Sequence, residues 1–376
     1  MNHATIHEVK GPESGAVYLK SIVPSELSVC NKAESFLQSG FWGSFKAHFG
    51  WNVRAFTVDW GFGGERPLLV IRRRLAFGFC FAYVPWGPEF PEGFPDDGAA
   101  RNTALLELAR SLCPLMPDNV AFIRFDPPWY TEGPGTPAPV LSEPFSPAGA
   151  DVQPPDTVLL DLTQPEKALL GGMKGKWRYN VGLAGKRGVT VRRGGSGADL
   201  ERFYQLLTET ARRDGIALHS LGYYKTLFTH CAGYLDQGQE AALYLAEHEG
   251  EVLAGIVVLF RGAQAVYLYG ASSDRKRNLM APYALQWSAI QDAKARGCRV
   301  YDLFGIPPRD DPGHPMAGLY RFKTGFGGRI IHRPGSWDYA YRPLVKALFV
   351  LAEGLRKKLR TFRSRRSHKE ARNMKR

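Results

Sequence analysis

A lysine within a glycine-rich stretch is the residue whose type and setting point most directly to chemistry. Lys323 follows Phe322, and four glycines lie close by in the sequence, at Gly318, Gly325, Gly327 and Gly328. Because glycine has no side chain, it lets the backbone approach a ligand closely. A fixed ammonium group in such a place could stabilise the oxyanion that forms during acyl transfer. On the residue alone, a solvated surface lysine explains the pattern equally well.

The sequence offers little for other reaction classes. It contains no Gly-x-Ser-x-Gly motif and no cysteine that stands out beside a histidine, so we expect no covalent enzyme intermediate. The five cysteines form no Cys-x-x-Cys pair, and we expect all of them to be structural. His48, His219, His230, His248 and His314 are isolated from one another, without metal-ligand spacing. We therefore predict no metal site and no cofactor.

Two further groups of residues are candidates for binding. One helical segment carries five basic residues that could contact nucleic-acid phosphates, although such a run is usually a solvated helix face; they are Lys174, Lys176, Arg178, Lys186 and Arg187. Tyr267 and Tyr269 lie two residues apart in an expected strand, so their side chains should share one face. Tyr269 is our choice for a residue that lines a groove. Two core tyrosines are the competing interpretation.

Length and composition define the class of protein that must position these residues. At about 150 residues per domain, 376 residues predict two domains. With 44% hydrophobic and 23% charged residues, the chain is typical of a globular protein, which excludes disordered, collagen-like and coiled-coil classes. No uncharged apolar run approaches the ~20 residues of a spanning helix, and the N-terminus lacks the apolar stretch of a secretion signal. We therefore expect a cytoplasmic protein.

The net charge of +13 is concentrated at the C-terminus. Eleven lysines or arginines and two glutamates lie in residues 353–376, so +9 of the total falls in this tail. A basic tail favours a polyanionic partner, either nucleic acid or an anionic membrane, and a solubilising tail is the alternative. An apolar stripe also runs through the segment, at Leu344, Leu348, Leu351, Leu355 and Leu359. It predicts peripheral membrane contact by an amphipathic helix. The competing interpretation is that the stripe through Leu355 packs onto the first domain; both can hold, since Leu359 and the residues after it would remain exposed.

The first half of the chain alternates helices and strands, as its hydrophobic periodicity indicates. We predict helices at 34–49 and 101–115, and strands at 53–60, 68–76, 77–84 and 120–125. A stretch rich in proline, glycine and serine follows at 131–156 and is typical of a loop or linker.

The second half starts a new pattern. We predict strands at 157–162, 189–193, 241–247, 252–261, 264–270, 299–304 and 328–333, and helices at 166–173, 177–186, 199–213, 223–228, 282–296 and 344–358. Thr163 and Glu166 should form a capping box. The order hairpin, strand, helix, strand between residues 241 and 304 is that of the N-acetyltransferase fold, a fold-level analogy.

The analogy does not extend to coenzyme A. In that fold, a glycine-rich loop before the helix holds the pyrophosphate of coenzyme A with backbone N–H groups. The corresponding segment, 275–283, contains no glycine, and Pro282 lacks an N–H group. The sequence therefore argues against coenzyme A as the acyl donor.

Several stretches carry a family resemblance. They are Lys-Trp-Arg-Tyr-Asn at 176–180 with Arg-Gly-Val-Thr-Val at 187–191, Leu-Tyr-Gly-Ala-Ser-Ser at 268–273, Tyr-Asp at 301–302, the run 318–328 around Phe322 and Lys323, and, in the first half, Leu-Gln-Ser at 37–39 and Tyr-Val-Pro-Trp-Gly-Pro at 83–88. With these residues the chain resembles the Fem family of peptidoglycan interpeptide-bridge aminoacyltransferases. That family moves an amino acid from aminoacyl-tRNA to the stem peptide of a cell-wall precursor.

The resemblance implies a fold of α/β class with mixed sheets (α+β). Two tandem acetyltransferase-like (GNAT-like) domains are expected, without the long helical-hairpin arm of some members. The first would comprise residues 1–156, completed by the C-terminal helix and basic tail at 334–376. The second would comprise residues 157–333.

The resemblance also implies roles for individual residues. The Phe322 carbonyl and Lys323 would lie at the transfer site, and Lys46 would bind phosphate of the precursor. His219, Tyr223 and Tyr269, with Tyr267 as the alternative to Tyr269, would contact the same precursor, and the basic run at 174–187 would meet the tRNA acceptor end. Tyr83 and Trp86 would contribute to substrate binding from the first domain.

Two departures from the family pattern concern phosphate binding. The loop Pro85-Trp86-Gly87-Pro88 has tryptophan where the family usually has arginine. His219 likewise replaces the arginine that usually lies four residues before the first of the paired tyrosines, here Tyr223.

The function implied by the resemblance is transfer from aminoacyl-tRNA to the stem-peptide amine of lipid II or UDP-MurNAc-pentapeptide. The ester is already activated, so direct transfer needs only alignment, a deprotonated amine and a stabilised oxyanion. We expect a monomer, possible contact with the inner face of an anionic membrane, and no cofactor. A coenzyme A-dependent N-acyltransferase and a non-catalytic nucleic-acid or membrane binder on the same scaffold are the alternatives.

Overall fold

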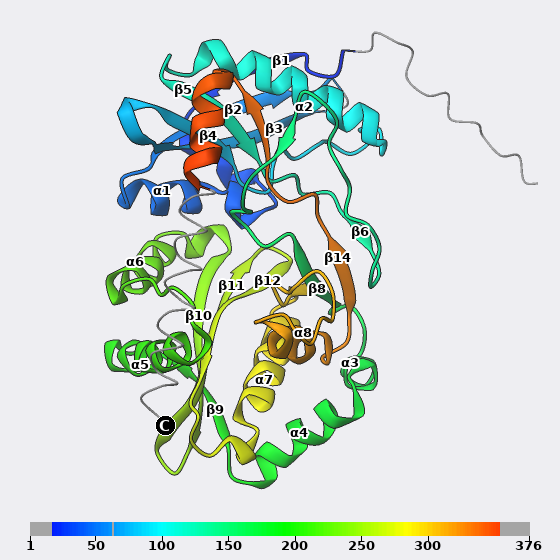
Figure 1. Cartoon of the computed structure of the whole chain (residues 1–376). Helices are drawn as coiled ribbons and strands as arrows, with labels where there is room; N and C mark the ends of the chain where they lie inside the picture. The colour runs from blue at the N-terminus through cyan, green and yellow to red at the C-terminus, as the bar shows by residue number, and fades with distance from the viewer. Residues whose placement is uncertain (1–16, 62–63, 354–376) are drawn as a thin grey trace, which may run out of the picture.

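The computed structural model describes residues 17–61 and 64–353, which build two mixed sheets placed one above the other (Figure 1). The first sheet has the strand order β1-β2-β3-β4-β5-β15-β7, and the second has the order β6-β14-β8-β13-β12-β11-β10-β9. The predicted α/β class with mixed sheets is therefore confirmed. The longest helix within the described ranges is α5, with 18 residues.

The first-sheet unit comprises this sheet and the helices that cover it. Its strands are β1 (Ser21–Ser25), β2 (Asn52–Asp59), β3 (Glu65–Arg74), β4 (Cys80–Val84), β5 (Val120–Phe125), β7 (Ser146–Pro147) and β15 (Trp337–Ala340). Helix α2 (Gly98–Leu112) packs on one face, and α1 (Gly40–His48) packs on the other together with the helical residues 343–353. Strands β4 and β5 are buried on both faces, which explains their nearly continuous apolar sequences.

The second-sheet unit comprises the other sheet and six helices. Its strands are β6 (Thr131–Glu132), β8 (Asp156–Asp161), β9 (Thr190–Gly194), β10 (Gln239–His248), β11 (Glu251–Arg261), β12 (Gln264–Ser272), β13 (Val300–Asp302) and β14 (Arg329–His332). Helices α5 (Gly197–Asp214) and α6 (Leu221–Ala232) pack on one face; on the other lie α3 (Glu166–Gly172), α4 (Gly175–Lys186), α7 (Ala281–Ala295) and α8 (Ala317–Thr324).

The two units repeat one topology. In each, an antiparallel hairpin (β2–β3 or β10–β11) leads to a third strand, a helix, and a strand that pairs in parallel with the third. The parallel pairs differ in length. Strand β4 pairs with β5 at five positions, whereas β12 pairs with β13 only at residues 264–266, although β12 continues to Ser272.

One hydrophobic core joins the two units. It contains Phe41 and Phe45 of α1 together with Tyr223 of α6, and the rings of Phe45 and Tyr223 lie 5.0 Å apart. Arg261 of β11 reinforces the contact by donating hydrogen bonds to the carbonyls of Asn31 (2.9 Å) and Ala33 (2.6 Å). The site described below can therefore draw residues from both units.

Several local expectations fail for identifiable reasons. The expected helix at 34–49 is divided into a 3-10 turn (Phe36–Gln38) and α1, because Ser39 caps α1 with its hydroxyl. The capping box predicted at Thr163 is absent; that hydroxyl donates to Asp161, and a capping box instead opens α5 at Ser196 and Asp199. Helix α8 was not predicted, because its glycines suggested a loop.

Candidate functional site

Lys323 lies next to the end of strand β13. Strand β13 ends at Asp302, the last residue paired with β12, whereas β12 continues to Ser272; the Lys323 side chain from α8 lies just beyond this end, between Tyr267 of β12 and the residues that follow β13. Its Nζ donates hydrogen bonds to the carbonyls of Phe304 and Gly305, the latter at 2.9 Å. On the other side, Nζ lies 5.0 Å from the centre of the Tyr267 ring.

The environment of Lys323 makes its ammonium group chemically unusual. The residue is only 6% exposed, and burial lowers the pKa of its ammonium to about 7 although the nearby Asp302 carboxylate acts in the opposite direction. Asp302 itself is buried, and its Oδ1 accepts hydrogen bonds from the Thr157 hydroxyl and from the Phe304 N–H (2.7 Å). Lys323 is thus a buried cation whose hydrogen bonds go to neutral carbonyls, which is not the setting of a solvated lysine.

The Phe322 carbonyl lies beside α4. It accepts a hydrogen bond of 2.9 Å from the Trp177 indole N–H, which uses one of the two lone pairs of the oxygen. The Phe322 ring packs against Tyr283 and Phe326, with centres 5.4 and 5.2 Å away. The backbone at 322–323 is therefore fixed from both sides.

The glycines near Lys323 serve close packing within the protein. A Cβ at Gly325 would lie 2.1 Å from the Trp177 ring, and one at Gly328 would lie 2.5 Å from the Leu159 carbonyl oxygen. Gly318, by contrast, has open space beside it. The expectation that these glycines let a ligand approach is corrected. Gly325, Gly327 and Gly328 instead let other parts of the chain pack closely against them.

We expect Gly325→Ala to lower the stability of the protein. The added methyl group must displace Trp177, and overpacking of this kind costs about 1–3 kcal/mol. Thermal unfolding would be measured with Gly318→Ala as the control, since that change adds a methyl group in α8 where nothing lies within 4 Å. Equal melting temperatures of the two variants would contradict the packing argument.

Tyr267 and Tyr269 lie on opposite faces of β12. A β-bulge shifts the register between Val257 and Val258 of β11, so that Tyr269 and Tyr267 oppose consecutive residues and Leu268 is the extra one. Tyr267 packs with the core on the α7 side, and Tyr269 packs with the core shared by the two units. The prediction that period-2 alternation places both side chains on one face is wrong, because the bulge breaks the period.

Lys46 of α1 forms a cluster with residues of the second-sheet unit. Its Nζ lies 4.2 Å from the Trp42 ring and 5.6 Å from the Tyr223 ring. The Tyr223 ring stacks on His219 at 4.0 Å, and its hydroxyl lies 3.2 Å from that of Tyr269. The structure thus brings together four of the predicted substrate-binding residues, Lys46, His219, Tyr223 and Tyr269, which we call the Lys46 cluster.

The charges of the Lys46 cluster are not neutralised from within. Burial, and then the positive charge of Arg73, lower the pKa of Lys46 to about 8. Desolvation and the charge of Lys46 likewise lower the pKa of His219. Within residues 17–61 and 64–353, no ion pair joins Lys46 to a carboxylate. An anion that approached the cluster would meet a cation already surrounded by aromatic rings.

The two predicted residues of the first-sheet unit are in different settings. Tyr83 is 1% exposed, and its hydroxyl donates a hydrogen bond to the buried Asp126 carboxylate, so it is not available to a substrate. The proposed substrate role of Tyr83 therefore gains no support from its position. Trp86 is also largely buried, between the Phe304 ring at 5.6 Å and the Arg333 guanidinium at 4.1 Å.

The predicted basic run divides into two groups. Arg178 donates to carbonyls at the end of α3, including that of Gly171 (3.1 Å), and Arg187 donates to the Asn278 carbonyl, so both have structural partners. The three lysines extend from α4 or its N-cap into solvent; they are Lys174, Lys176 and Lys186. The backbone N–H of Lys174 donates to the Gly325 carbonyl (2.9 Å), which places the start of α4 beside the Lys323 helix.

Two residues of this region were missed at the sequence level. Asp302 acts on Lys323 electrostatically, and Arg333 stacks on Trp86 with an enclosed guanidinium. The Tyr-Asp pair at 301–302 was a usable signal for the first. No sequence signal identified Arg333, because its contact with Trp86 joins residues 247 positions apart.

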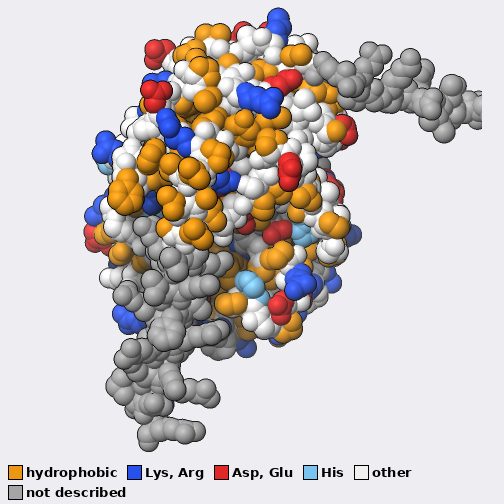
Figure 2. Space-filling model, turned by 45° about the horizontal axis from the view of Figure 1, so that its top comes forward, with side chains coloured by type: hydrophobic (Ala, Val, Ile, Leu, Met, Phe, Trp, Pro, Cys, Tyr) orange, Lys and Arg blue, Asp and Glu red, His pale blue; other side chains and the backbone are white. Residues whose placement is uncertain are grey.

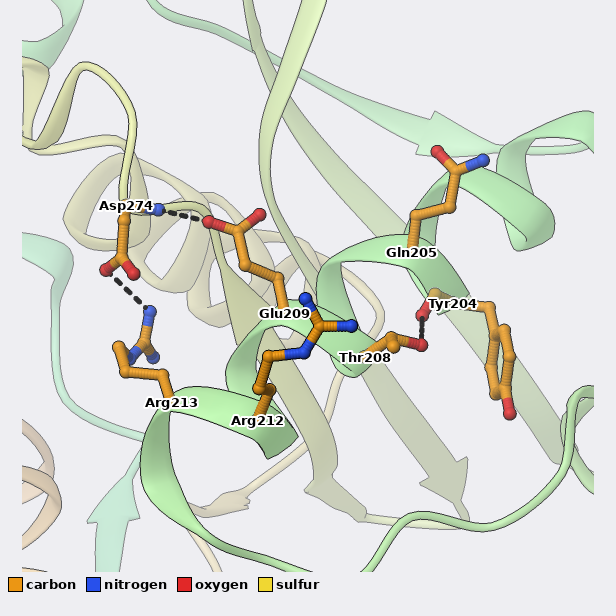
Figure 3. Close-up of a pocket in the computed structure, with 7 residues that line it drawn as sticks. All are labelled: Tyr204, Gln205, Thr208, Glu209, Arg212, Arg213 and Asp274. Carbon is orange, nitrogen blue, oxygen red and sulfur yellow. Dashed lines mark hydrogen bonds and ion pairs between the residues drawn. The ribbon is translucent and has the colours of Figure 1, made fainter. Parts of the chain in front are cut away.

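The surface also carries a cavity that contains none of the predicted site residues. It has a volume of about 750 Å³ and lies along α5, lined by Tyr204, Gln205, Thr208, Glu209, Arg212, Arg213 and Asp274 (Figure 3). Arg213 pairs with Asp274 at 3.0 Å, and Glu209 accepts from the Asp274 backbone N–H at 2.7 Å. Two of its four charged side chains, Arg213 and Asp274, are thus already paired with each other.

Two further properties bear on the class of protein. Among the described residues, no group of three or more histidine, cysteine, aspartate or glutamate side chains could hold a metal ion. In the same ranges, every helix is too short or too polar to cross a membrane.

Comparison with known proteins agrees with this fold. The lipid II:glycine glycyltransferase of Staphylococcus saprophyticus is 24% identical over 265 residues, which is 55% of this chain and 63% of that protein. The protein of the same name from Staphylococcus aureus (strain USA300) is 23% identical over 274 residues, with the same shares. The chain thus spans less than two thirds of the length of these curated relatives.

A solved structure extends the comparison to most of the chain. The crystal structure of FemX matches with a TM-score of 0.69 and 19% identity, over 86% of this chain and 97% of FemX. The match shows that this chain shares the fold of FemX over most of its length. The model of the FemAB family matches residues 146–249 and 232–354, more than half of the sequence. The predicted resemblance is confirmed, and the chain belongs to the FemAB family.

Proposed function

We propose that this protein transfers an amino acid from aminoacyl-tRNA to the stem-peptide amine of a peptidoglycan precursor, lipid II or its UDP-linked form. Membership of the FemAB family supports the proposal, as does similarity to proteins named lipid II:glycine glycyltransferase. The observation that carries it is Lys323: a buried ammonium with a pKa of about 7, held by the Phe304 and Gly305 carbonyls just beyond the end of β13 and opposite Tyr267 of β12.

Lys323 would stabilise the tetrahedral oxyanion. Its ammonium is fixed by the Phe304 and Gly305 carbonyls and by its position in α8. Little reorganisation of the protein is therefore needed when negative charge develops on the carbonyl oxygen of the ester. The low exposure of the site strengthens the interaction, because water screens it less.

The Phe322 carbonyl would orient the attacking amine. One lone pair is occupied by Trp177, and the other remains able to accept a hydrogen bond from the acceptor N–H. The uncharged amine then attacks the ester carbonyl, the bond to the tRNA 3′ oxygen breaks, and the proton lost by the amine nitrogen passes to that oxygen. No covalent intermediate on the enzyme is required.

The Lys46 cluster would hold the phosphates of the precursor. A half-enclosed ammonium with no carboxylate partner gains most from a phosphate, and the Tyr223 and Tyr269 hydroxyls lie close enough to each other to share a bound oxygen. The cluster contains residues of both units, so the precursor would lie across their junction. His219 would add its stacked ring at the exposed edge.

The acceptor end of tRNA would approach along α4. Lys174, Lys176 and Lys186 lie on the surface there, and Lys174 and Trp177 contact the segment that carries Lys323. Phosphate contacts of this kind position the nucleic acid without reading its sequence.

The proposal is tested by incubating the purified full chain with charged tRNAs and each precursor, and reading the products by mass. The expected product is the precursor increased by one or more aminoacyl residues, and it should not form when the tRNA is uncharged. Transfer from an acyl-coenzyme A, or no product with any charged tRNA, would contradict the proposed activity.

Peripheral membrane contact is also part of the proposal. In the helical residues 343–353, Val345 and Phe349 pack against the first-sheet core, so the helix is attached by this face. The leucines of the predicted stripe point away: Leu344, Leu348 and Leu351 are 83%, 68% and 65% exposed. The interpretation that these leucines pack onto the first unit is therefore corrected, and Leu355 and Leu359 lie outside the described residues. In Figure 2, hydrophobic side chains gather beside lysines and arginines on one face of the molecule.

We expect the triple variant Leu344→Ser, Leu348→Ser, Leu351→Ser to bind anionic vesicles at least about tenfold more weakly than the parent, because three exposed leucines no longer insert. Co-sedimentation with phosphatidylglycerol-containing vesicles measures this. The control is Val140→Ser, which removes another exposed apolar side chain, 75% exposed. Vesicle binding that is unchanged in the triple variant would exclude the leucine stripe as the membrane contact.

A further inference from the structure

A cavity of about 380 Å³ lies next to the segment that holds Lys323. Its wall includes Arg309, Asp151, Asp156, His332 and Arg333, and the remainder is mainly proline and glycine. We call it the Arg333 cavity. Gly305, whose carbonyl accepts from Lys323, lies only four residues before Arg309. Because a residue spans at most about 3.6 Å, the cavity wall begins within roughly 14 Å of the proposed transfer centre.

Arg333 is a buried cation that forms no ion pair with any residue in 17–61 or 64–353. The residue is 8% exposed, and neither its Nε nor its Nη1 has a hydrogen-bond acceptor in those ranges. Its Cζ lies 4.1 Å from the Trp86 ring centre. Burial lowers the pKa of the guanidinium although the charge of Asp302 acts in the opposite direction. A buried charge of this kind is costly unless a counter-charge joins it.

The carboxylates nearby are already engaged elsewhere. Asp156 accepts a hydrogen bond from the His332 ring, and Asp302 accepts from Thr157 and from the Phe304 N–H. Asp151 accepts from the backbone N–H of Ser336 at 2.8 Å. None of these three is the missing acceptor for the enclosed nitrogens of Arg333.

The balance of charges in the cavity specifies the kind of anion. Two arginines, Arg309 and Arg333, face two aspartates, Asp151 and Asp156, so the wall is not the strongly basic surface that a polyphosphate or RNA backbone requires. A single monoanion fits better. A guanidinium matches a planar carboxylate because its N–H groups form a fork, and proline side chains would cover the apolar groups next to that carboxylate.

We propose that the Arg333 cavity binds the C-terminal carboxylate of the acceptor peptide, with Arg333 as its counter-charge. The inference rests on the proposed function, since it names a second contact for the same acceptor. The carboxylate would fix the far end of the stem peptide while its amine lies at the Phe322 carbonyl. Recognition of both ends would select peptides of the correct length.

The test compares binding of UDP-MurNAc-pentapeptide with binding of its C-terminal amide, by calorimetry and without any donor. The parent protein should bind the amide about 10- to 100-fold more weakly, the range expected when a hydrogen-bonded charge is lost. Arg333→Met should bind both forms equally, at the level of the amide. Arg329→Met is the matched control, because it removes an exposed arginine of the same strand that pairs with Glu132, and it should keep the preference.

The outcomes separate this inference from the proposed function. Equal affinity of the parent for acid and amide would overturn the carboxylate site, and continued transfer to both would leave the proposed function standing. Inorganic phosphate that competes with the acid in the parent, but not in Arg333→Met, would assign the cavity to phosphate and overturn the carboxylate. A parent protein that binds neither form, and that also transfers nothing to lipid II, would overturn both proposals. The acid–amide comparison needs no variant, so a misfolded Arg333→Met protein cannot obscure the result.

Discussion

Lys323→Met should reduce the rate of aminoacyl transfer by about 10²–10³-fold while the protein remains folded. Loss of one preorganised group that stabilises an oxyanion has this size of effect. Folding should survive because methionine has a similar length and its apolar end suits a site that is only 6% exposed, where the ammonium is poorly solvated.

The measurement is single-turnover transfer from charged tRNA, with thermal unfolding recorded on the same preparations. Lys167→Met is the matched control, because it removes an exposed lysine of α3 in the same unit. A folded Lys323→Met protein that transfers at the parent rate would show that the assignment of Lys323 is wrong.

Lys46→Met should weaken binding of the UDP-linked precursor by about 10- to 100-fold and change the rate at saturation much less. The expected size follows from the loss of one charged hydrogen-bond donor to phosphate. The effect should appear in KM because, in the proposed arrangement, Lys46 binds phosphate and takes no part at the reacting amine. Lys32→Met, which changes an exposed lysine of the first-sheet unit, serves as the control.

The pH dependence of precursor binding offers an independent check. Lys46 is charged below its pKa of about 8 and loses its proton above it, and only the charged form attracts phosphate. Affinity should therefore fall as the pH rises through about 8 in the parent, and this fall should disappear in Lys46→Met. A parent affinity that is constant between pH 7 and 9 would contradict a phosphate contact by Lys46.

The sequence was sufficient for the elements whose periodicity is strong. The strand predicted at 120–125 has the bounds of β5, Val120–Phe125, because every residue in it is apolar or buried. The hairpin of β10 and β11 was also evident. The glycine-rich setting of Lys323 singled it out as a candidate, but its burial depends on where β13 ends beside β12, which no local pattern indicates.

The predictions that the structure corrects depend on contacts between residues that are far apart in the sequence. The bulge at Leu268 is a mismatch between two strands, so the sequence of β12 alone predicts regular alternation. Helix α8 forms despite its glycines because Gly325 allows Trp177 to pack against it. Arg333 packs on Trp86 although the two residues are 247 positions apart, so the sequence around neither residue indicates the contact.

The parallel ladders of the two repeated units differ in length, and the two units carry different candidate site residues. In the first-sheet unit, β4 stays paired with β5 to its last residue, and stacked Phe81 and Phe122 rings, 5.2 Å apart, close the seam. In the second-sheet unit, the ladder ends after three paired residues. The Lys323 Nζ is held just beyond that end by the Phe304 and Gly305 carbonyls. The two copies of the topology are therefore not interchangeable: the first-sheet unit carries Lys46 on α1, and the second-sheet unit holds the buried Lys323 just beyond the end of its parallel ladder.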